Sequence, residues 1–378
     1  MIFMPSLSLY IHIPWCIKIC PYCDFNAYKL KKHDSKIHYI RHLLTDLNNH
    51  KDIIKNRIIK TIFIGGGTPS LLDINLLKYL LNTVKKNISY NNNIEITIEI
   101  NPETMTIEKI LDYIQCGINR ISLGIQTFNP ILLKLLGRTH SIENTIHLLY
   151  EIKKYTELNV NIDLMYGIPQ QTLQHCLSDL EQAILINPNH ISWYQLNIEK
   201  NTIFYYQKPQ LPKESEIWKM YNQGNKLLIQ ANYKRYEISS YAKNNKTCLH
   251  NLNYWKFGDY LGIGCGAHSK ITKKNGDIVR IIKKNRLYEY CNKNKMYISD
   301  NIIIPDQEKP GEYFMNVCRL FKPIKKTDFN LYTQLKLDYI KKKIKKAVLK
   351  KYLIETPEYW NITLKGRNFL NDLIMLFI

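Results

Sequence analysis

Hydrophobic runs typical of β-strands recur six times within the first two hundred residues of the chain. They are separated by segments in which the apolar residues have helical spacing, such as 70–86 and 107–116. The predicted strands cover residues 7–14, 61–67, 95–101, 120–126, 159–167 and 190–199. Regular alternation of strand and helix favours parallel βα units with right-handed crossovers. We therefore expect an α/β fold built on a partial, TIM-like (β/α)6 barrel.

The regular pattern loosens after about residue 207. A helix, a Tyr-rich stretch, a Gly-rich turn at 262–266 and a basic run at 270–295 follow, which we interpret as a connector packed on the barrel. Beyond residue 301 the sequence predicts helices, one of them over 332–353, then a short strand and turn at 359–365 and a last helix. The predicted division is a core barrel over 1–240, a connector over 241–300 and a smaller, mainly helical, winged-helix-like C-terminal domain over 301–378.

The composition is that of an ordinary folded protein, with 45% hydrophobic and 22% charged residues in 378. A formal net charge of +21 would attract polyanions. Lys, Asn and Ile also crowd evident loops such as 91–93 and 243–246, so a compositional drift of the whole genome explains the charge better than a nucleic-acid partner does. Peripheral contact with an acidic membrane surface stays open, whereas nucleic-acid binding is not favoured.

The chain has nine cysteines, an odd number that does not suit a disulfide framework. The first residues lack the basic and apolar regions of a secretory signal, and no apolar run is long enough to span a membrane. These features predict a cytoplasmic protein. In a reducing compartment, closely spaced cysteines indicate metal or redox chemistry.

Three cysteines, Cys16, Cys20 and Cys23, have C-x3-C-x2-C spacing. Three thiolates can hold three irons of a [4Fe–4S] cluster and leave the fourth iron open. An open iron can chelate the amino and carboxylate groups of S-adenosylmethionine (SAM). The alternatives are a structural zinc site, which normally needs a fourth ligand from a second cysteine pair that the sequence lacks, or three unrelated buried thiols. The other six cysteines are isolated, and we interpret them as core or surface thiols.

Polar and glycine residues follow the predicted strands, and the functional groups of such barrels lie at the C-terminal strand ends. Glycines after the second strand let the backbone approach a ligand closely, and Thr68 followed by Pro69 predicts a helix start. In a SAM protein, the methionine amino group is the expected ligand of this turn. Any one of the polar residues alone could be an ordinary buried or surface group. Together the candidate SAM-binding residues are Tyr10, Gly66, Gly67, Thr68, Glu99, Gln126, Arg138 and Asp163.

His250 stands in an aromatic stretch, H-N-L-N-Y-W at 250–255. A neutral imidazole is a standard axial ligand of haem iron, and neighbouring aromatic rings can cover a porphyrin face. A histidine among aromatic residues can equally be a packing residue. The residues alone leave both interpretations open.

Several segments carry a resemblance to a known family. They are LSLYIHIPWC at 7–16, CPYCDFN at 20–26, FIGGGTPS at 63–70, NRISLGIQ at 119–126, LGR at 136–138, DLMYG at 163–167, HNLNYW at 250–255 and GIGCGAH at 262–268. Jointly they resemble the HemW family of radical SAM proteins, relatives of the oxygen-independent coproporphyrinogen III oxidases. The resemblance spans nearly the whole chain.

The resemblance implies a haem chaperone, a cytoplasmic protein that binds haem and passes it to haem-requiring acceptors, including respiratory enzymes at the membrane. By motif match, Cys16, Cys20 and Cys23 would ligate the [4Fe–4S] cluster. One or two SAM molecules would contact Tyr10, Gly66, Gly67, Thr68, Glu99, Gln126, Arg138 and Asp163. His250 would touch or ligate haem.

One departure separates this chain from the oxidase relatives. Those enzymes carry a further cysteine in C-x3-C-x2-C-x-C, and Phe25 occupies that place here. They also begin with an N-terminal extension, whereas this chain enters its first strand by Leu7. Coproporphyrinogen III oxidase, a radical SAM decarboxylase, is therefore the alternative function, and we assign no catalytic residue.

Overall fold

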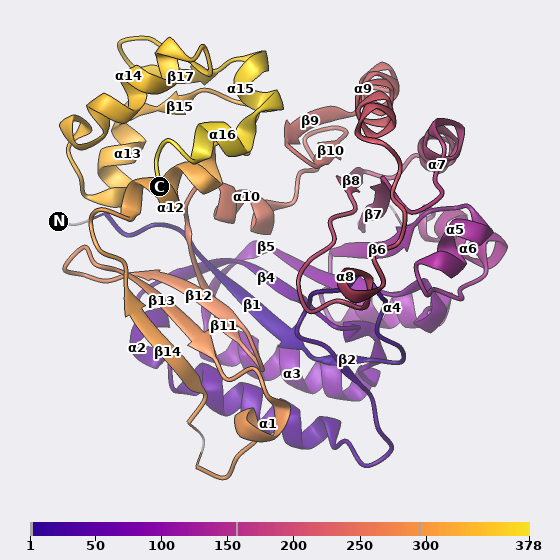
Figure 1. Cartoon of the computed structure of the whole chain (residues 1–378). Coiled ribbons are helices and arrows are strands. Elements are labelled where there is room, and N and C mark those ends of the chain that lie inside the picture. The colour runs from indigo at the N-terminus through magenta and orange to yellow at the C-terminus, as the bar shows by residue number, and fades with distance from the viewer. Residues whose placement is uncertain (1–2, 156–157, 295) are drawn as a thin grey trace.

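A single twelve-stranded sheet forms the centre of the computed structural model, which describes residues 3–155, 158–294 and 296–378 (Figure 1). Its middle six strands are neighbours and run parallel, and they confirm the six predicted βα units. They are β1 (Leu7–Ile13), β4 (Ile58–Gly66), β5 (Ser89–Ile100), β6 (Arg120–Gln126), β7 (Asn159–Tyr166) and β8 (His190–Gln195). The predicted fold class, a partial barrel with a smaller helical C-terminal part, is confirmed.

Helices follow these strands, and the longer ones cover their outer side (Figure 1). They are α1 (Lys36–Asn48), α2 (Lys51–Ile54), α3 (Ile74–Asn87), α4 (Ile107–Gln115), α5 (Pro130–Leu135), α6 (Ile142–Ile152), α7 (Leu173–Ile186), α8 (Ile203–Gln207) and α9 (Glu214–Gln230). The apolar stripe of α3, with Leu77, Leu80, Leu81 and Val84, is buried against the sheet because these positions share one helix face. The helix predicted over 107–116 is confirmed as α4. The one predicted over 70–86 is confirmed as α3 after a 3-10 turn, η1 (Pro69–Leu71).

Side chains along each parallel strand point alternately outward to the helices and inward to the barrel. In β6, Ile121, Leu123 and Ile125 are fully buried in the outer core, whereas Arg120 and Gln126 point inward. The same alternation places a polar set inside the barrel from the other strands: Ser8, Thr61, Glu95, Glu99, Asn161, Asp163, His190 and Ser192. The inner surface of the barrel is therefore polar although each strand is mostly apolar.

The sheet continues beyond the barrel on both sides. Next to β1 lie β11 (Asp259–Ile263), which is parallel to it, and then β12 (His268–Thr272), β13 (Ile278–Lys283) and β14 (Ile298–Ile303), which are antiparallel. Next to β8 lie β10 (Ser240–Ala242) and β9 (Lys234–Glu237). The sequence did not predict these six strands, because they are short and carry many polar residues. The basic run at 270–295 falls mainly on β12, β13 and α11 (Leu287–Tyr290), and its last residue lies outside the described residues.

The C-terminal part combines helices with a three-stranded antiparallel sheet, β15-β17-β16. Its elements are α12 (Lys309–Val317), β15 (Ile324–Lys325), α13 (Lys326–Thr333), η3 (Leu337–Ile340), α14 (Lys341–Leu349), β16 (Leu353–Glu355), β17 (Tyr359–Ile362), α15 (Leu364–Asn368) and α16 (Leu370–Ile374). The single helix predicted over 332–353 is wrong. Gln334 has a left-handed backbone with φ 62°, which ends α13, and the chain then re-enters helix in two further steps. The predicted division into three segments stays a prediction.

This part has its own hydrophobic core, with Phe314, Phe329 and Trp360 among its buried residues. Phe257 joins that core from outside the C-terminal part and packs edge-on against Tyr313, with ring centroids 5.5 Å apart. Phe257 follows directly on α10 (Leu249–Trp255), the helix that carries His250. Nowhere in the described residues is there a helix with the length and apolar character needed to cross a membrane.

Candidate functional site

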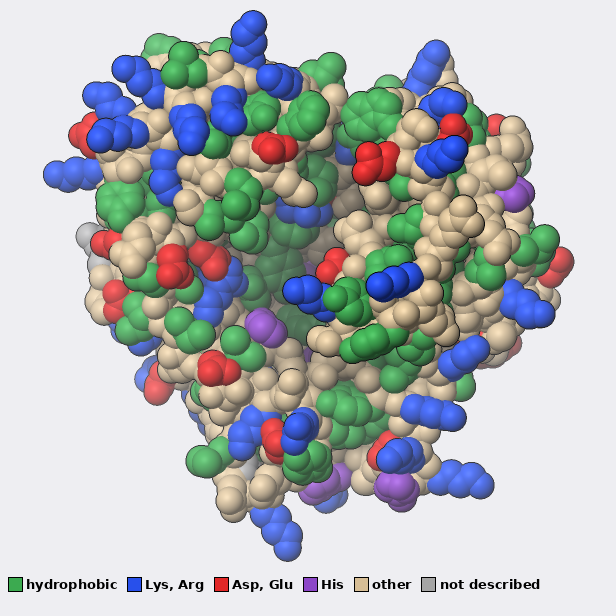
Figure 2. Space-filling model, in the orientation of Figure 1, with side chains coloured by type: hydrophobic (Ala, Val, Ile, Leu, Met, Phe, Trp, Pro, Cys, Tyr) green, Lys and Arg blue, Asp and Glu red, His purple; other side chains and the backbone are tan. Residues whose placement is uncertain are grey.

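The inside of the barrel is a cavity of about 600 Å³. Figure 2 shows the molecule hollowed between the C-terminal part at upper left and the elements around α7 to α9 at right. The cavity wall includes all twelve sequence-predicted site residues: Tyr10, Cys16, Cys20, Cys23, Gly66, Gly67, Thr68, Glu99, Gln126, Arg138, Asp163 and His250. The fold thus brings together residues that are up to 240 positions apart in the chain, from Tyr10 to His250. Its volume suits one or more ligands of small-molecule size.

The cysteine loop leaves the barrel at its C-terminal edge. Two short strands, β2 (Trp15–Cys16) and β3 (Tyr28–Lys29), pair in parallel and close the loop at its base. Cys16 is buried, Cys20 and Cys23 are half-buried, and all three are free thiols. Within the described residues no three His, Cys, Asp or Glu side chains converge on one metal ion. A cubane cluster does not need such convergence, since its three irons each bind one thiolate around the cluster.

Burial favours the protonated thiol at Cys16 and Cys23 in the absence of metal. Desolvation raises the pKa of Cys16, which the hydroxyl of Thr68 opposes by donating a hydrogen bond to Cys16 Sγ at 3.3 Å. Desolvation also raises the pKa of Cys23 to about 11. Iron binding would therefore displace protons from these thiols. Unpaired thiols at the rim of a cavity fit three ligands of an iron–sulfur cluster.

The glycine turn after β4 is hydrogen-bonded to the start of the cysteine loop. The amide of Gly67 donates to Ile13 O, and the amide of Thr68 donates to Trp15 O, each at 2.7 Å. Thr68 precedes η1 as predicted, but its hydroxyl faces Cys16 and does not cap the turn. A Cβ at position 67 would lie 2.6 Å from Trp15 O, so only glycine fits there. The turn therefore fixes the entry of the loop that carries the cysteines.

We expect Gly67→Ala to destabilise the fold by about 1–3 kcal/mol, because the added methyl overlaps backbone atoms that cannot rotate away. Thermal unfolding measures this as a lower midpoint temperature. Gly311→Ala in α12 is the matched control, since a Cβ there first meets the flexible end of Ile378 at 3.2 Å. Equal midpoints for Gly67→Ala and the control would contradict the expected overlap.

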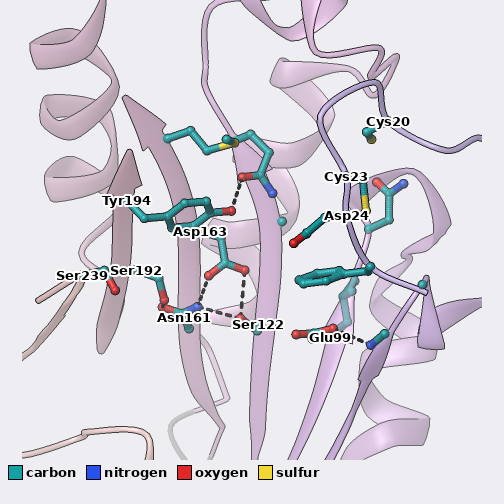
Figure 3. Close-up of a pocket in the computed structure, with 18 of the residues that line it drawn as sticks. Cys20, Cys23, Asp24, Glu99, Ser122, Asn161, Asp163, Ser192, Tyr194 and Ser239 are labelled. Carbon is teal, nitrogen blue, oxygen red and sulfur yellow. Dashed lines mark hydrogen bonds between the residues drawn. The ribbon is translucent and has the colours of Figure 1, made fainter. Parts of the chain in front are cut away.

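Two carboxylates face the cavity, one from β5 and one from β7, the strands on either side of β6. Glu99 accepts a hydrogen bond from the amide of Gly66 at 3.0 Å. Burial, and then the charge of the nearby Asp163 carboxylate, raise the pKa of Glu99 to about 8. Asp163 accepts hydrogen bonds from Asn161 at 2.7 Å and Ser122 at 3.0 Å (Figure 3), and burial raises its pKa as well. Such carboxylates suit a ligand that brings a cation or hydroxyl groups into the cavity.

Gln126 and Arg138 complete this end of the cavity. Gln126 has a left-handed backbone with φ 72° at a register shift between β6 and β7. A non-glycine residue in this region is strained, and such strain is typical of functional positions. Its amide oxygen accepts a hydrogen bond from Tyr194 at 2.8 Å. Arg138 donates to Gly124 O at 2.5 Å and to the hydroxyl of Tyr22 at 3.3 Å, which links the cysteine loop to β6.

His12 is a functional candidate that the sequence analysis missed. Its Nε2 lies 2.8 Å from Asn26 O, so Nε2 carries the proton and Nδ1 accepts a hydrogen bond from Tyr10 at 3.0 Å. Asn26 also donates to Cys265 O at 3.0 Å and thereby fixes the exit of the cysteine loop. The available signal was the alternation in β1, since positions 8, 10 and 12 all point inward.

The same signal identifies further wall residues that the sequence analysis missed. They are Phe63, Arg120, Ser122, Asn161, Ser192 and Tyr194. Two donors in the cavity wall, Arg120 Nε and Trp255 Nε1, are buried without a hydrogen-bond partner among the described residues. Buried donors without partners cost free energy, so they indicate an acceptor that a ligand supplies.

His250 lines the same cavity from helix α10. It is 1% exposed, and its ring stacks on Phe63 with centroids 4.9 Å apart. Its Nδ1 lies 2.7 Å from the hydroxyl of Thr61, and its Nε2 lies 3.0 Å from the hydroxyl of Tyr254. Burial, and then the charge of Arg120, lower the pKa of His250 to about 3. The imidazole is therefore neutral, which is the form that ligates iron.

The fold is that of the radical SAM superfamily, whose family model matches residues 10–183. The chain is 50% identical over 99% of its length to the "Heme chaperone HemW" of Buchnera aphidicola subsp. Schizaphis graminum, of which it covers 99%. It is 44% identical to the "Heme chaperone HemW" of Escherichia coli K12, with 100% of both chains aligned. The chain belongs to the HemW family. A solved structure of coproporphyrinogen III oxidase (HemN) from Escherichia coli has a TM-score of 0.85 at 21% identity, covering 99% of this chain and 90% of that one, and it shows the shared fold.

Proposed function

We propose that the protein is a haem chaperone that binds haem at His250 and transfers it to haem-requiring acceptor proteins in the cytoplasm or at the membrane. The identity of its relatives as haem chaperones supports the general role. The observation that carries the proposal is that a buried, neutral histidine shares one cavity with three free cysteines. The aromatic rings of Tyr10, Phe63 and Tyr254 surround that histidine and suit a porphyrin.

The unpartnered donors in the cavity wall also support an anionic ligand. Haem carries two propionates, and Arg120 and Trp255 each bring to the cavity wall a buried donor that lacks an acceptor among the described residues. A guanidinium is well suited to a carboxylate because its N–H groups match the two oxygens. The apolar and basic features of the cavity thus fit the two halves of the haem molecule.

We propose that Cys16, Cys20 and Cys23 hold a [4Fe–4S] cluster. When bound, the cluster offers an open iron that can chelate the amino and carboxylate groups of SAM. The turn at Gly66 and Gly67 offers close backbone approach, and Glu99 and Asp163 offer carboxylates for the SAM ammonium or ribose hydroxyls. Tyr10, Thr68, Gln126 and Arg138 complete the proposed SAM site, for one or two molecules.

The first experiment is anaerobic cluster reconstitution followed by haem titration, monitored by absorbance. We expect one-to-one binding that His250→Ala weakens more than about tenfold, a loss of at least about 1.4 kcal/mol in binding free energy. His147→Ala is the matched control, because His147 is exposed on α6, away from the cavity. Haem binding that does not depend on His250 would remove the basis of the proposed haem site.

The alternative function, coproporphyrinogen III oxidase, shares the fold. It predicts that the reconstituted protein consumes SAM and releases carbon dioxide from coproporphyrinogen III under anaerobic conditions. A chaperone instead leaves the porphyrinogen unchanged and restores activity to a haem-free acceptor enzyme after haem loading. The two assays on one preparation separate the two functions.

A further inference from the structure

Two hydroxyl groups determine which nitrogen of His250 carries the proton. The hydroxyl of Thr61 in β4 donates its hydrogen to Ser8 Oγ at 2.8 Å. It has no second hydrogen to give, so it must accept from His250 Nδ1–H at 2.7 Å. The neutral ring then has a lone pair on Nε2, and Tyr254 donates its hydroxyl hydrogen to that lone pair at 3.0 Å. The ring is held in the tautomer whose Nε2 can ligate a metal.

The helix that carries His250 is itself fixed at its start. The carboxylate of Glu95, on β5, accepts hydrogen bonds from the amides of Leu249 and His250, each at 3.0 Å. Glu95 and Thr61 belong to neighbouring strands of the barrel. The backbone and the ring of His250 are therefore both held by hydrogen bonds to the same sheet. Tyr254 differs from these groups, since it is only half-buried and lines the cavity. Of the two hydroxyl groups bonded to the ring, that of Tyr254 is the one that can move away without disturbing a barrel strand.

A second histidine has the same hydrogen-bond arrangement without access to the cavity. His190 Nδ1 donates to the amide oxygen of Asn161, and its Nε2 accepts from the hydroxyl of Tyr236 at 2.7 Å. His190 is not part of the cavity wall, whereas His250 and Tyr254 are. A tyrosine hydroxyl therefore donates to a buried imidazole at His12, His190 and His250. Of these three histidines, only His250 belongs to the cavity wall, where a ligand can approach the covered nitrogen.

We propose that Thr61 and Tyr254 act as positioning residues for haem, Thr61 by presenting Nε2 as the ligating nitrogen and Tyr254 by covering that nitrogen until haem arrives. This inference rests on the proposed function. Haem uptake then breaks the Tyr254 O–H···Nε2 hydrogen bond and forms one Nε2–iron bond, while tyrosine keeps its proton and no electron is transferred. Haem release reverses the exchange, with the Tyr254 hydroxyl competing for the nitrogen. Transfer to an acceptor would be easier because the Tyr254 hydroxyl can hydrogen-bond to Nε2 again as the iron leaves.

Two variants test the two roles in opposite directions. Tyr254→Phe removes the competing hydroxyl and should tighten haem binding about five- to tenfold, since a typical hydrogen bond contributes about 1 kcal/mol. Thr61→Val removes the acceptor of Nδ1–H and should weaken haem binding about tenfold or more, as is usual when the partner of a ligating histidine is lost. Tyr260→Phe is the control, because its ring packs 4.3 Å from that of Tyr254 but its hydroxyl accepts from Arg280 and does not touch His250.

A measurement on the haem-free protein tests this inference independently of the proposed function. Imidazole ¹⁵N chemical shifts of the haem-free protein report the tautomer, and the His250 signals among the 11 histidines are assigned by their loss in His250→Ala. We expect the Nδ1–H form in the wild type and a shift towards the Nε2–H form in Thr61→Val. An Nε2–H form in the wild type, or unchanged or weaker haem binding in Tyr254→Phe, overturns the inference. If the wild type has the expected tautomer but His250→Ala leaves haem affinity unchanged, the proposed haem site is overturned instead.

Discussion

Replacing Cys20 with alanine is expected to abolish assembly of the iron–sulfur cluster. Each of the three thiols is proposed to ligate one iron, and no fourth cysteine follows in the loop because Phe25 occupies that place. Iron and sulfide contents after anaerobic reconstitution measure the loss, together with the visible absorbance of the cluster. Cys176→Ala is the control, since Cys176 is buried in α7 outside the cavity and should leave iron loading unchanged.

Cluster assembly should also depend on pH in a defined direction. The thiol of Cys23 has its pKa raised to about 11, and that of Cys16 is also raised, so both bind protons at neutral pH that iron must displace. Iron loading at limiting iron is therefore expected to increase as the pH rises from 7 to 9. Full iron loading of Cys20→Ala, or stoichiometric zinc in place of iron in the wild type as purified, would contradict the proposed cluster site.

Glu99→Gln is expected to stabilise the ligand-free protein. The pKa of Glu99 is about 8 in the folded state and 4.5 in its unperturbed state, so the folded state binds the extra proton between these values. Stability therefore falls as the pH rises from about 4.5 to 8, and a neutral amide avoids the cost. We expect the variant to gain about 2–4 kcal/mol in unfolding free energy at pH 8, and no comparable gain at pH 4.

Denaturant unfolding at pH 4, 6 and 8 measures this difference. Glu108→Gln is the matched control, because Glu108 is exposed in the first turn of α4, where its pKa is lowered by the hydroxyl of Thr106, and its loss should not stabilise the protein. SAM binding should change in the opposite sense and weaken in Glu99→Gln, since the variant cannot offer a carboxylate. A variant that is no more stable than wild type at pH 8 would show that the pKa of Glu99 is not raised in the folded protein.

The strand pattern predicted the barrel, because parallel strands with an outer helical layer need long apolar runs on one face. It did not predict the polar inner wall. The run at 120–126 is mostly apolar, and its inward-facing residues include Arg120, Ser122 and Gln126. Alternation of polar and apolar residues over so few positions is a weak signal in the sequence. Glu99 and Asp163 were predicted because the functional groups of such barrels lie towards the C-terminal ends of the strands.

Other features depend on long-range contacts that no local pattern contains. Residues 259–303 form strands because β11 finds the free edge of β1, more than 240 residues earlier in the chain. The partners of His250 likewise come from β4 and β5, and only the three-dimensional fold reveals that Thr61 and Glu95 hold it. The break after Gln334 depends on one left-handed residue, which sequence composition does not fix.

Helix α10 belongs to two cores at once. His250 faces the barrel, Trp255 lies under the guanidinium of Arg319 at 4.1 Å, and Phe257 is fully buried in the C-terminal core. Arg319 is also ion-paired with Glu237 beside the cavity. The position of His250 is therefore tied to the packing of the C-terminal part on the barrel, since one short segment supplies side chains to both.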